Sequence, residues 1–303
     1  MTAGGITPPS AVAFLGLGKM GAPMAANLAA GGWSVRAYDL SRPVLEAFLA
    51  AAPRATGTAT AAAAAAGAEV VVTMLPDGRA VRAALLETGV VAAMPRGALV
   101  VDMSSSAPLG TRALGAELAR LGVELVDAPV SGGVKRAREA TLAIMAGGDP
   151  AAVRRCRPLL AAMGSAVYET GPLGSGHAMK ALNNFVSAAG LVAACEALVV
   201  GKRFGLDPAL MVDVLNASSG RNNTTELKAK QFMLSGTFAS GFSLALMAKD
   251  LRTAADLADE LGVAAPLTRA MAERWTRAQD LLAPGADHTE MLRAVDAAPA
   301  GRG

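Results

Sequence analysis

Residues 12–39 read VAFLGLGKMGAPMAANLAAGGWSVRAYD and decide the fold of the first part of the chain. A short apolar run ends in a cluster of glycines, a stretch of helical length follows, and Gly31 and Gly32 end that stretch before a second apolar run. This order predicts a strand, a tight turn, a helix and a second strand. Because parallel strands are joined by a crossover, usually a helix, the segment indicates the first βαβ unit of a parallel sheet.

The glycines of this segment are spaced as GxGxxG, between the predicted strand and the predicted helix. In a dinucleotide-binding turn, Gly16 would permit the tight turn, Gly18 would let a pyrophosphate approach the backbone, and Gly21 would allow close packing of the helix on the strand. The helix N-terminus would add N–H donors and a positive dipole end. A plain glycine-rich turn is the alternative, and the flanking strand and helix favour the dinucleotide. The predicted cofactor-binding residues of the motif are Gly16, Leu17, Gly18, Lys19, Met20 and Gly21.

Asp39 ends the second apolar run, where a carboxylate can accept hydrogen bonds from the ribose hydroxyls of an adenosine. Its charge would repel a 2′-phosphate, so the sequence predicts NAD as cofactor, with NADP less favoured. Two alternatives remain open: Asp39 could cap the next helix, and the nearby Arg42 could bind a phosphate.

The rest of the chain falls into two parts of different rhythm. An unusually long helical pattern runs from His177 to about Phe204, after a glycine-rich segment at Gly171, and no convincing strand follows it. Before that segment, strands alternate with helices, which predicts a doubly wound, Rossmann-type parallel sheet covered on both faces. We therefore predict an NAD-binding Rossmann domain at residues 1–172 and an all-helical substrate and dimerisation domain at residues 173–303. The further predicted strands are 70–75, 98–103, 124–128, 142–145 and 167–169, and the predicted helices include 58–66 and 110–121.

Composition excludes several classes of function. The 303 residues are 52% hydrophobic but only 4% aromatic, which favours helix-rich cores of Ala, Val, Leu and Met. The formal net charge of +3 comes from scattered basic residues, so nucleic acid is not an expected partner. The two cysteines form no CxxC pair, and His177 and His288 have no partners at metal-ligand or catalytic-triad spacing. We therefore expect no metal site and no serine-protease-like triad.

The ends of the chain and its most apolar stretch bear on location and assembly. Residues 1–10 lack the basic and apolar regions of a signal peptide, and the residues from Ala297 onward read as a frayed tail. Residues 185–200 are strongly apolar but are interrupted by Gly190 and Glu196, which indicates a buried helix rather than a membrane span. We expect a cytoplasmic protein with no membrane partner. Because a small domain cannot easily surround this helix, we also expect a homodimer or homotetramer.

The segment DAPVSGG, residues 127–133, follows another predicted strand and ends in a turn of small residues. Successive backbone N–H groups beside the hydroxyl of Ser131 would form a concave site suited to a carboxylate, with Gly132 and Gly133 completing it. A plain turn between a strand and a loop is an equal alternative on spacing alone.

Two further constellations combine charged and amide side chains with apolar helices. Lys180, Asn183 and Asn184 stand at i, i+3 and i+4, so all three share one face of the long predicted helix. Lys249 and Asp250 form a charged pair within FSLALMAKDL, residues 242–251. The alternatives are a lysine that extends to solvent in the first case and a surface salt bridge in the second.

Taken in order, FLGLGKMGAPMAANL, DAPVSGG, GxxGxGxxxKxxNN and KDL resemble the β-hydroxyacid dehydrogenase family, which includes 3-hydroxyisobutyrate dehydrogenases and tartronate semialdehyde reductases. The resemblance extends from Val12 to about Leu282. It implies an oxidoreductase that transfers a hydride between NAD and a small 3-hydroxy acid similar to 3-hydroxyisobutyrate. The products would be a semialdehyde or keto acid, and no metal would be needed.

The resemblance also implies a role for individual residues. Lys180 would be the catalytic acid/base, Asn184 would hold the substrate, and Asn183 stands where the related phosphogluconate enzymes carry a histidine. The turn at Ser131, Gly132 and Gly133 would grip the substrate carboxylate. Besides Asp39 and the glycine motif, the residues placed against the cofactor would be Leu75, Pro76, Ser104, Phe242 and Lys249, with Asp250 orienting Lys249.

In that mechanism a neutral Lys180 would take the hydroxyl proton during oxidation, and its ammonium form would return a proton during reduction. Because a free lysine has a pKa near 10.4, burial and the positive nicotinamide ring are expected to lower it. The alternative readings are an NADPH-dependent glyoxylate or succinic semialdehyde reductase of the same fold and, further away, a non-catalytic dinucleotide-binding module.

Two departures from the family pattern concern the substrate. After DAPVSGG the family usually has small residues, including a glycine before the next strand, whereas this chain has Lys135, Arg136 and then Ala140. Arg221, in the polar stretch 218–223, could bind a second anionic group, although a solvated loop between helices is slightly favoured there.

Overall fold

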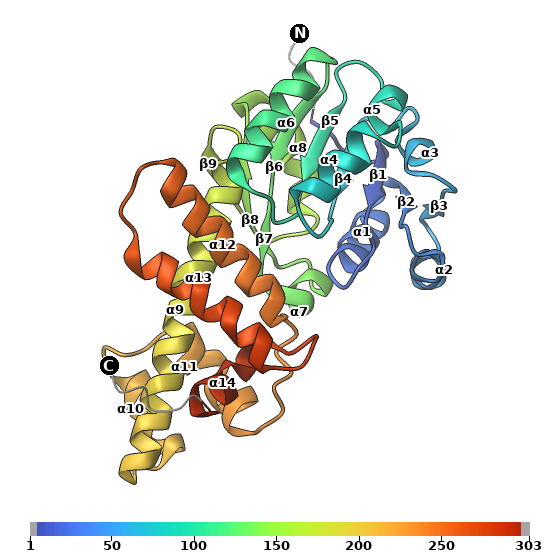
Figure 1. Cartoon of the computed structure of the whole chain (residues 1–303). Helices are drawn as coiled ribbons and strands as arrows, with labels where there is room; N and C mark the ends of the chain where they lie inside the picture. Colours follow the sequence, from blue (N-terminus) through green and yellow to red (C-terminus); the bar gives the residue numbers. More distant parts are fainter. Residues whose placement is uncertain (1–4, 298–303) are drawn as a thin grey trace. The chain divides into compact units, whose positions relative to one another are not determined.

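The protein is described here by a computed structural model, which covers residues 5–297. The chain forms two compact units, residues 1–180 and residues 181–303, and one long helix continues from the first into the second (Figure 1). Residues 1–4 and 298–303 lie outside the described part. They include the first residues of the segment in which no signal peptide is predicted and most of the predicted frayed tail.

The first unit contains a nine-stranded sheet. Its strands are β1 (Ala11–Leu15), β2 (Ser34–Tyr38), β3 (Thr56–Gly57), β4 (Val70–Thr73), β5 (Leu99–Asp102), β6 (Glu124–Asp127), β7 (Val130–Ser131), β8 (Ala143–Gly147) and β9 (Ala166–Gly171). They lie in the order β3-β2-β1-β4-β5-β6-β8-β7, with β9 paired to β8. The pairs from β3 to β6 are parallel, β8 is antiparallel to β6 and β7, and β9 is parallel to β8.

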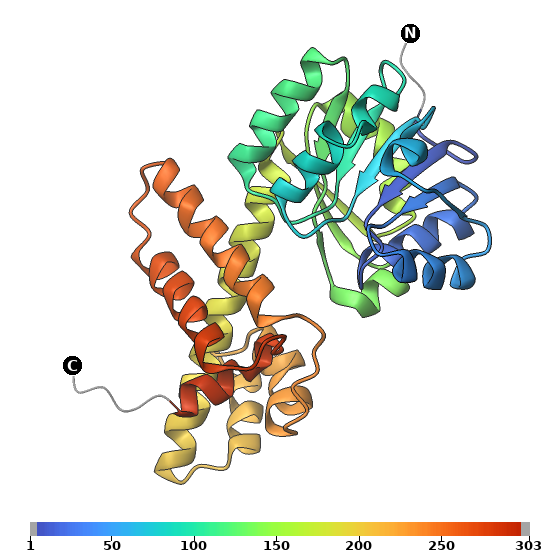
Figure 2. The same ribbon diagram turned by 45° about the vertical axis from the view of Figure 1, so that its right-hand side comes forward.

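Helices cover both faces of this sheet, as Figure 2 shows. The central strands β4 and β5 read VVVT and LVVD, and every one of their residues is buried, as expected for strands packed on both faces. On one face lie α1 (Gly21–Ala30), α2 (Arg42–Ala51) and α8 (Pro150–Ala161). On the other face lie α3 (Ala61–Ala65), α4 (Gly78–Leu86), α5 (Val90–Ala93) and α6 (Pro108–Arg120).

The order of the strands reverses beside β1. The chain passes from β1 to β2 and β3 on one side and then returns to β4 on the other side of β1. In open α/β sheets, ligands bind at the carboxyl ends of the strands at such a reversal. The glycine-rich turn that follows β1 and the segment that follows β4 are therefore the place where the fold alone would seat a ligand.

The second unit is helical, and its only strand-like pairing among the described residues is an isolated bridge between Ser243 and Asp287. Its core surrounds the fully buried side chain of Trp275 and includes buried residues of most of its helices. The helices are the remainder of α9 (Ser175–Phe204), then α10 (Pro208–Ala217), α11 (Asn223–Leu227), a π-helix η1 (Ala229–Leu234), α12 (Leu244–Glu260), α13 (Pro266–Leu281), a 3₁₀ turn η2 (His288–Glu290) and α14 (Met291–Ala297).

Helix α9 is 30 residues long, and by length and composition alone it could cross a membrane. One of its faces, with Leu191, Cys195 and Leu198, is buried in the core of the second unit. This face of α9 therefore packs as part of a protein core. The other cysteine, Cys156, is buried in the core of the first unit, and burial raises the pKa of both free thiols to about 12.

The predicted fold class is confirmed: a mainly parallel sheet of Rossmann type precedes a helical part. Strands β3 and β7 were not predicted, because two residues are too few to show a period. Helix α3 begins later than predicted because Thr60 caps it, its hydroxyl accepting a hydrogen bond from the N–H of Ala63. The predicted boundary at 172/173 precedes α9, whereas the two units divide within this helix, after Lys180.

Ala140 has a left-handed backbone conformation, with φ of +53°, between α7 (Gly133–Arg138) and β8. A Cβ atom in this conformation costs roughly 1–2 kcal/mol relative to glycine. The resemblance places a glycine just before the Thr-Leu pair at this point, and this chain makes the turn with an alanine, although glycine adopts such a conformation most easily.

Candidate functional site

The glycine-rich turn after β1 has two positions that admit no side chain and one that is open. A Cβ atom on Gly16, where φ is +98°, would lie 2.4 Å from the carbonyl oxygen of Met74. A Cβ atom on Gly21 would lie 2.0 Å from the carbonyl oxygen of Gly16. A Cβ atom on Gly18 would have no neighbour within 4 Å. Gly16 and Gly21 therefore make the turn possible, and Gly18 leaves the outer side of the turn accessible.

The same turn also presents hydrogen-bond donors. Within residues 5–297, the backbone N–H groups of Lys19 and Met20 donate to no protein acceptor, and they precede the ten-residue helix α1. Open space beside Gly18, free N–H groups and the positive end of a helix are what a diphosphate requires. The turn thus fits the dinucleotide that the sequence predicts for it.

Asp39 connects this turn to the end of β2. Its Oδ2 accepts a hydrogen bond from the N–H of Leu17 at 2.7 Å, and its Oδ1 accepts one from the N–H of Ser41 at 2.8 Å. Each carboxylate oxygen can accept a further bond. The N-cap residue of α2 is Ser41, so Asp39 does not occupy the capping position considered as an alternative. Arg42 forms an exposed ion pair with Glu46 at 2.7 Å.

The segments after β4 and β5 are joined by hydrogen bonds. The N–H of Leu75 donates to Oγ of Ser104 at 2.9 Å, which brings together two positions predicted to contact the cofactor. The buried carboxylate of Asp102 accepts hydrogen bonds from Oγ1 of Thr73, the N–H of Ser104 and Oγ of Ser106, at 2.9–3.0 Å. This carboxylate, which sequence reasoning did not single out, therefore fixes the segment that carries Ser104.

The predicted carboxylate-binding turn lies at the end of β7. Gly132 and Gly133 are exposed and have φ of +136° and +69°, while Ser131 is partly buried. A Cβ atom on Gly132 would lie 2.6 Å from Cδ of Arg136, so this arginine packs its aliphatic part along the turn. A Cβ atom on Gly133 would have no neighbour within 4 Å. The turn is therefore open on the side of Gly133.

His177 stands in the first turn of α9 and is fully buried. The sequence shows no partner for it at metal-ligand or triad spacing, but in the structure its Nε2 lies 3.1 Å from the carbonyl oxygen of Ser104, and its Nδ1 lies 2.8 Å from Oγ1 of Thr111. These partners are 73 and 66 residues away in the sequence, so no spacing pattern could reveal them. The absence of a metal site remains a prediction, although residues 5–297 hold no group of three potential metal ligands.

Asp127, at the end of β6, holds the start of α9. Its Oδ1 accepts a hydrogen bond from the N–H of Gly174 at 2.7 Å, and its Oδ2 accepts one from the N–H of His177 at 2.8 Å. Burial of this carboxyl raises its pKa, and His177 and the two N–H groups act in the opposite direction. Lys180, which is partly buried, follows one helical turn later.

In the second unit, a buried carboxylate brings together the predicted residues of α9 and α12. Nδ2 of Asn184 donates to Oδ2 of Asp250 at 2.6 Å, and Nδ2 of Asn183 donates to Oδ1 of Asn184 at 3.2 Å. Nζ of Lys249 lies 3.2 Å from Oδ1 of Asp250. Asp250 is only 2% exposed, so this pair is not the surface salt bridge that was the alternative.

Phe242 lies in a loop that a second carboxylate holds in place. Oδ2 of Asp287 accepts hydrogen bonds from the N–H of Gly241 and Oγ of Ser240. Burial alone would raise the pKa of Asp287, but hydrogen bonds from His288, Thr289 and Ser240 keep it below its ordinary value. The ring of His288 packs edge-on against Phe242 with the ring centres 5.6 Å apart. Phe242 is thereby fixed at the start of α12.

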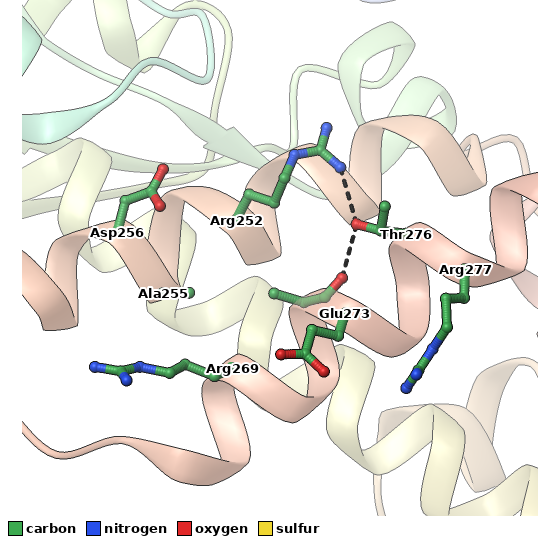
Figure 3. A pocket seen from close by; sticks show the side chains of 8 residues that line it. Arg252, Ala255, Asp256, Arg269, Glu273, Thr276 and Arg277 are labelled. Carbon is green, nitrogen blue, oxygen red and sulfur yellow. Dashed lines mark hydrogen bonds between the residues drawn. The ribbon is translucent and has the colours of Figure 1, made fainter.

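Arg221 forms an ion pair with Glu226, with Nε 3.4 Å from Oε1. The stretch around it is a loop that ends at Asn222, the N-cap of α11. A separate pocket lies between α12 and α13 and is lined by alternating charges (Figure 3). Arg252 donates there to Oγ1 of Thr276 at 3.2 Å. None of the predicted site residues lines this pocket.

Comparisons with known proteins agree with this geometry. Residues 11–171 match a family described as the NAD binding domain of 6-phosphogluconate dehydrogenase. Residues 174–295 match one described as the NAD-binding of NADP-dependent 3-hydroxyisobutyrate dehydrogenase. Fold and glycine turn together define an NAD(P)-binding oxidoreductase.

Individual relatives narrow this class. The chain is 38% identical to the 2-(hydroxymethyl)glutarate dehydrogenase of Eubacterium barkeri, over 85% of each chain. It is 35% identical to an NAD-dependent L-serine dehydrogenase of Pseudomonas aeruginosa, over 84% of this chain and 88% of the relative. The structure of Mycobacterium tuberculosis 3-hydroxyisobutyrate dehydrogenase with L-serine superposes with a TM-score of 0.86 and 35% identity, over 94% of this chain and 99% of the other. The chain belongs to the β-hydroxyacid dehydrogenase family, which confirms the resemblance.

The contrast between two glycines of the turn yields a first prediction. Gly18→Ala should leave the melting temperature nearly unchanged, because its methyl group meets no protein atom. The methyl group should instead occupy the side that the diphosphate approaches and weaken dinucleotide binding by about tenfold or more. Gly21→Ala should destabilise the protein itself by roughly 1–3 kcal/mol, because its methyl group collides with backbone. Thermal melts and calorimetric titration with NAD check both; unchanged dinucleotide affinity in Gly18→Ala would contradict the assignment.

Proposed function

We propose that the chain interconverts a small 3-hydroxy acid and its semialdehyde or keto acid with NAD as cofactor. The observation that carries this proposal is the double hydrogen bond from the start of α9 to Asp127. The strand that ends at Asp127 leads, four residues later, into the turn at Ser131. The candidate acid/base Lys180 and the candidate carboxylate site are thus attached to the same carboxylate.

In this mechanism the glycine turn and Asp39 would hold NAD, which when bound would supply the hydride acceptor for the carbon that carries the hydroxyl group, or as NADH the hydride donor in the reverse direction. The neutral amine of Lys180 takes the hydroxyl proton during oxidation, and its ammonium form protonates the forming alkoxide during reduction. The N–H groups of Gly132 and Gly133 and the hydroxyl of Ser131 bind the carboxylate of the substrate. This contact orients the hydroxyl-bearing carbon toward Lys180.

Residues of the second unit receive their roles from the family resemblance. Asn184 holds the substrate with Asn183 beside it, and Phe242 and Lys249 contact the nicotinamide end of the cofactor. The buried hydrogen bond from Asn184 to Asp250 supports these roles, because it gives the amide a single orientation. We further propose that residues 1–172 serve as the cofactor domain and residues 173–303 as the substrate and dimerisation domain.

Replacement of the acid/base tests the mechanism directly. Lys180→Ala should lower turnover roughly 10²- to 10⁴-fold, the usual loss for a positioned general acid or base, and should leave NAD affinity nearly intact. Lys202→Ala is a matched control, because Lys202 is an exposed lysine near the end of the same helix. Turnover at saturating substrate, NAD titration by calorimetry and circular dichroism provide the comparison. A loss of less than about tenfold would be smaller than the weak end of that range, so a Lys180→Ala enzyme that keeps more than about a tenth of wild-type turnover would show that the mechanism is wrong.

We assign NAD rather than NADP as the preferred cofactor because Asp39 stands at the end of β2 with a lone pair free on each oxygen. Asp39→Ser should relax this preference. Asp39→Asn separates charge from structure, because asparagine can still accept the hydrogen bond from Leu17 without repelling a phosphate. Both variants should gain activity with NADP relative to NAD in steady-state kinetics. A wild-type enzyme that uses NADP as well as NAD would contradict the assignment.

We also propose that the protein is a homodimer or homotetramer. By helical spacing, one face of α9 carries a stripe of exposed small and apolar residues from Val186, 68% exposed, to Phe204, 84% exposed. The exposed residues of the stripe are Val186, Ala193, Ala197, Val200 and Phe204. A second copy of the chain would remove this surface from water. Light scattering at micromolar concentration should give a multiple of the 30.4 kDa chain, and the mass of one chain would count against an oligomer.

We place the enzyme in the cytoplasm. Both cysteines are free and buried, which agrees with a reducing compartment. Its partner there is a small hydroxy-acid substrate.

A further inference from the structure

The imidazole ring of His177 has a polar partner at each nitrogen although no part of it reaches solvent. A carbonyl oxygen can only accept, so Nε2 carries a proton and donates to the carbonyl of Ser104. The hydroxyl of Thr111 faces Nδ1 and can serve as either donor or acceptor. The ring therefore has one fixed donor, and its orientation is determined by that bond.

Two buried carboxylates flank the ring. Oδ2 of Asp102 lies 3.7 Å from Nε2, and Oδ2 of Asp127 lies 3.8 Å from Nδ1. Each carboxylate is itself held by hydrogen bonds, Asp102 to the segment after β5 and Asp127 to the start of α9. The ring thus lies between the ends of two neighbouring strands, β5 and β6.

His177 consequently ties one turn of helix to several strands. Its backbone N–H donates to the carboxylate of Asp127 on β6, and its ring Nε2 donates to the carbonyl oxygen of Ser104 after β5. Oγ of Ser104 in turn accepts the N–H of Leu75 after β4. The preceding residue is also fixed, because a Cβ atom on Gly176 would lie 2.2 Å from the carbonyl oxygen of Met145 on β8.

We propose that His177 is a positioning residue for the reaction. Through Ser104 and Asp127 it fixes the first turn of α9, and so Lys180 one turn later, relative to the segments after β4 and β5 that are assigned to the cofactor. This inference rests on the proposed function of Lys180. A displacement of a reacting group by about 1 Å can cost around 100-fold in rate, so the fixation has a kinetic consequence.

Three variants in the full-length enzyme separate positioning from general stability. His177→Leu replaces the ring with an apolar side chain of moderate size and so loses both ring hydrogen bonds. His177→Gln retains an amide N–H for the carbonyl of Ser104 and an amide oxygen for the hydroxyl of Thr111. Val153→Ala is the control for stability, because Val153 is buried in the same unit on α8 and belongs to none of these hydrogen bonds.

His177→Leu should lower kcat roughly 10- to 100-fold, while its melting temperature falls no further than that of Val153→Ala, which keeps near-normal kcat. His177→Gln should recover kcat to within about fivefold of wild type, the value of one ordinary hydrogen bond. In the cofactor-free protein, amide hydrogen exchange of residues 174–180 should accelerate in His177→Leu and not in Val153→Ala. Near-normal kcat in His177→Leu would overturn the proposal, as would equal exchange in the two variants.

The double variant His177→Leu/Lys180→Ala distinguishes this inference from the function on which it rests. If His177 acts through Lys180, His177→Leu should cause no further loss of turnover once Lys180 is absent. An additive loss would overturn the positioning role, whereas high activity of Lys180→Ala alone would refute the acid/base assignment. Should His177→Leu fail to fold, Thr111→Val keeps the imidazole and removes the hydrogen bond at Nδ1, together with the bond from Oγ1 of Thr111 to the carbonyl oxygen of Ala107 within α6. This variant should raise the same local exchange and lower kcat, and unchanged values would overturn the proposal.

Discussion

The carboxylate of Asp127 accepts hydrogen bonds from two backbone N–H groups at the start of α9, and the placement of this helix on the sheet depends on this contact. A helix N-terminus has unsatisfied donors, and here the acceptor comes from a strand 47 residues earlier rather than from a local cap. Taking a carboxylate out of water is costly, which is why burial raises the pKa of Asp127. The two charge-assisted hydrogen bonds offset part of that cost and attach the long helix to the sheet.

The same solution recurs at other points. Asp102 fixes the segment after β5, Asp250 orients Asn184 and contacts Lys249, and Asp287 holds the loop before α12. In each case a carboxylate of little or no exposure gathers several donors from different elements. Candidate chemical groups thus stand on backbone that has few alternative positions, as precise catalysis requires. Burial of the acids and rigidity of the site are two aspects of one arrangement.

How far the sequence predicts this protein depends on the distance between partners. The turn from Gly16 to Gly21 and the shared face of Lys180 and Asn184 are visible because their residues are neighbours, and the order of the motifs identified the family. Hydrogen bonds from His177 to Ser104 and Thr111 were not visible, because their spacing follows no helical or strand period. For the same reason the sequence predicts a charge at Asp39 but not that its carboxylate also binds the glycine turn.

The two buried cysteines can report local opening of the protein, because a buried thiol is modified only when its surroundings open. Each unit contains one, buried in a core, and burial raises the pKa of both thiols to about 12, so neither is a nucleophile in the closed state at neutral pH. A thiol reagent would therefore modify Cys156 only when the sheet unit opens and Cys195 only when the helical unit opens. The labelling rates of the two sites, read by mass spectrometry, would show whether two units that share one helix open together or independently.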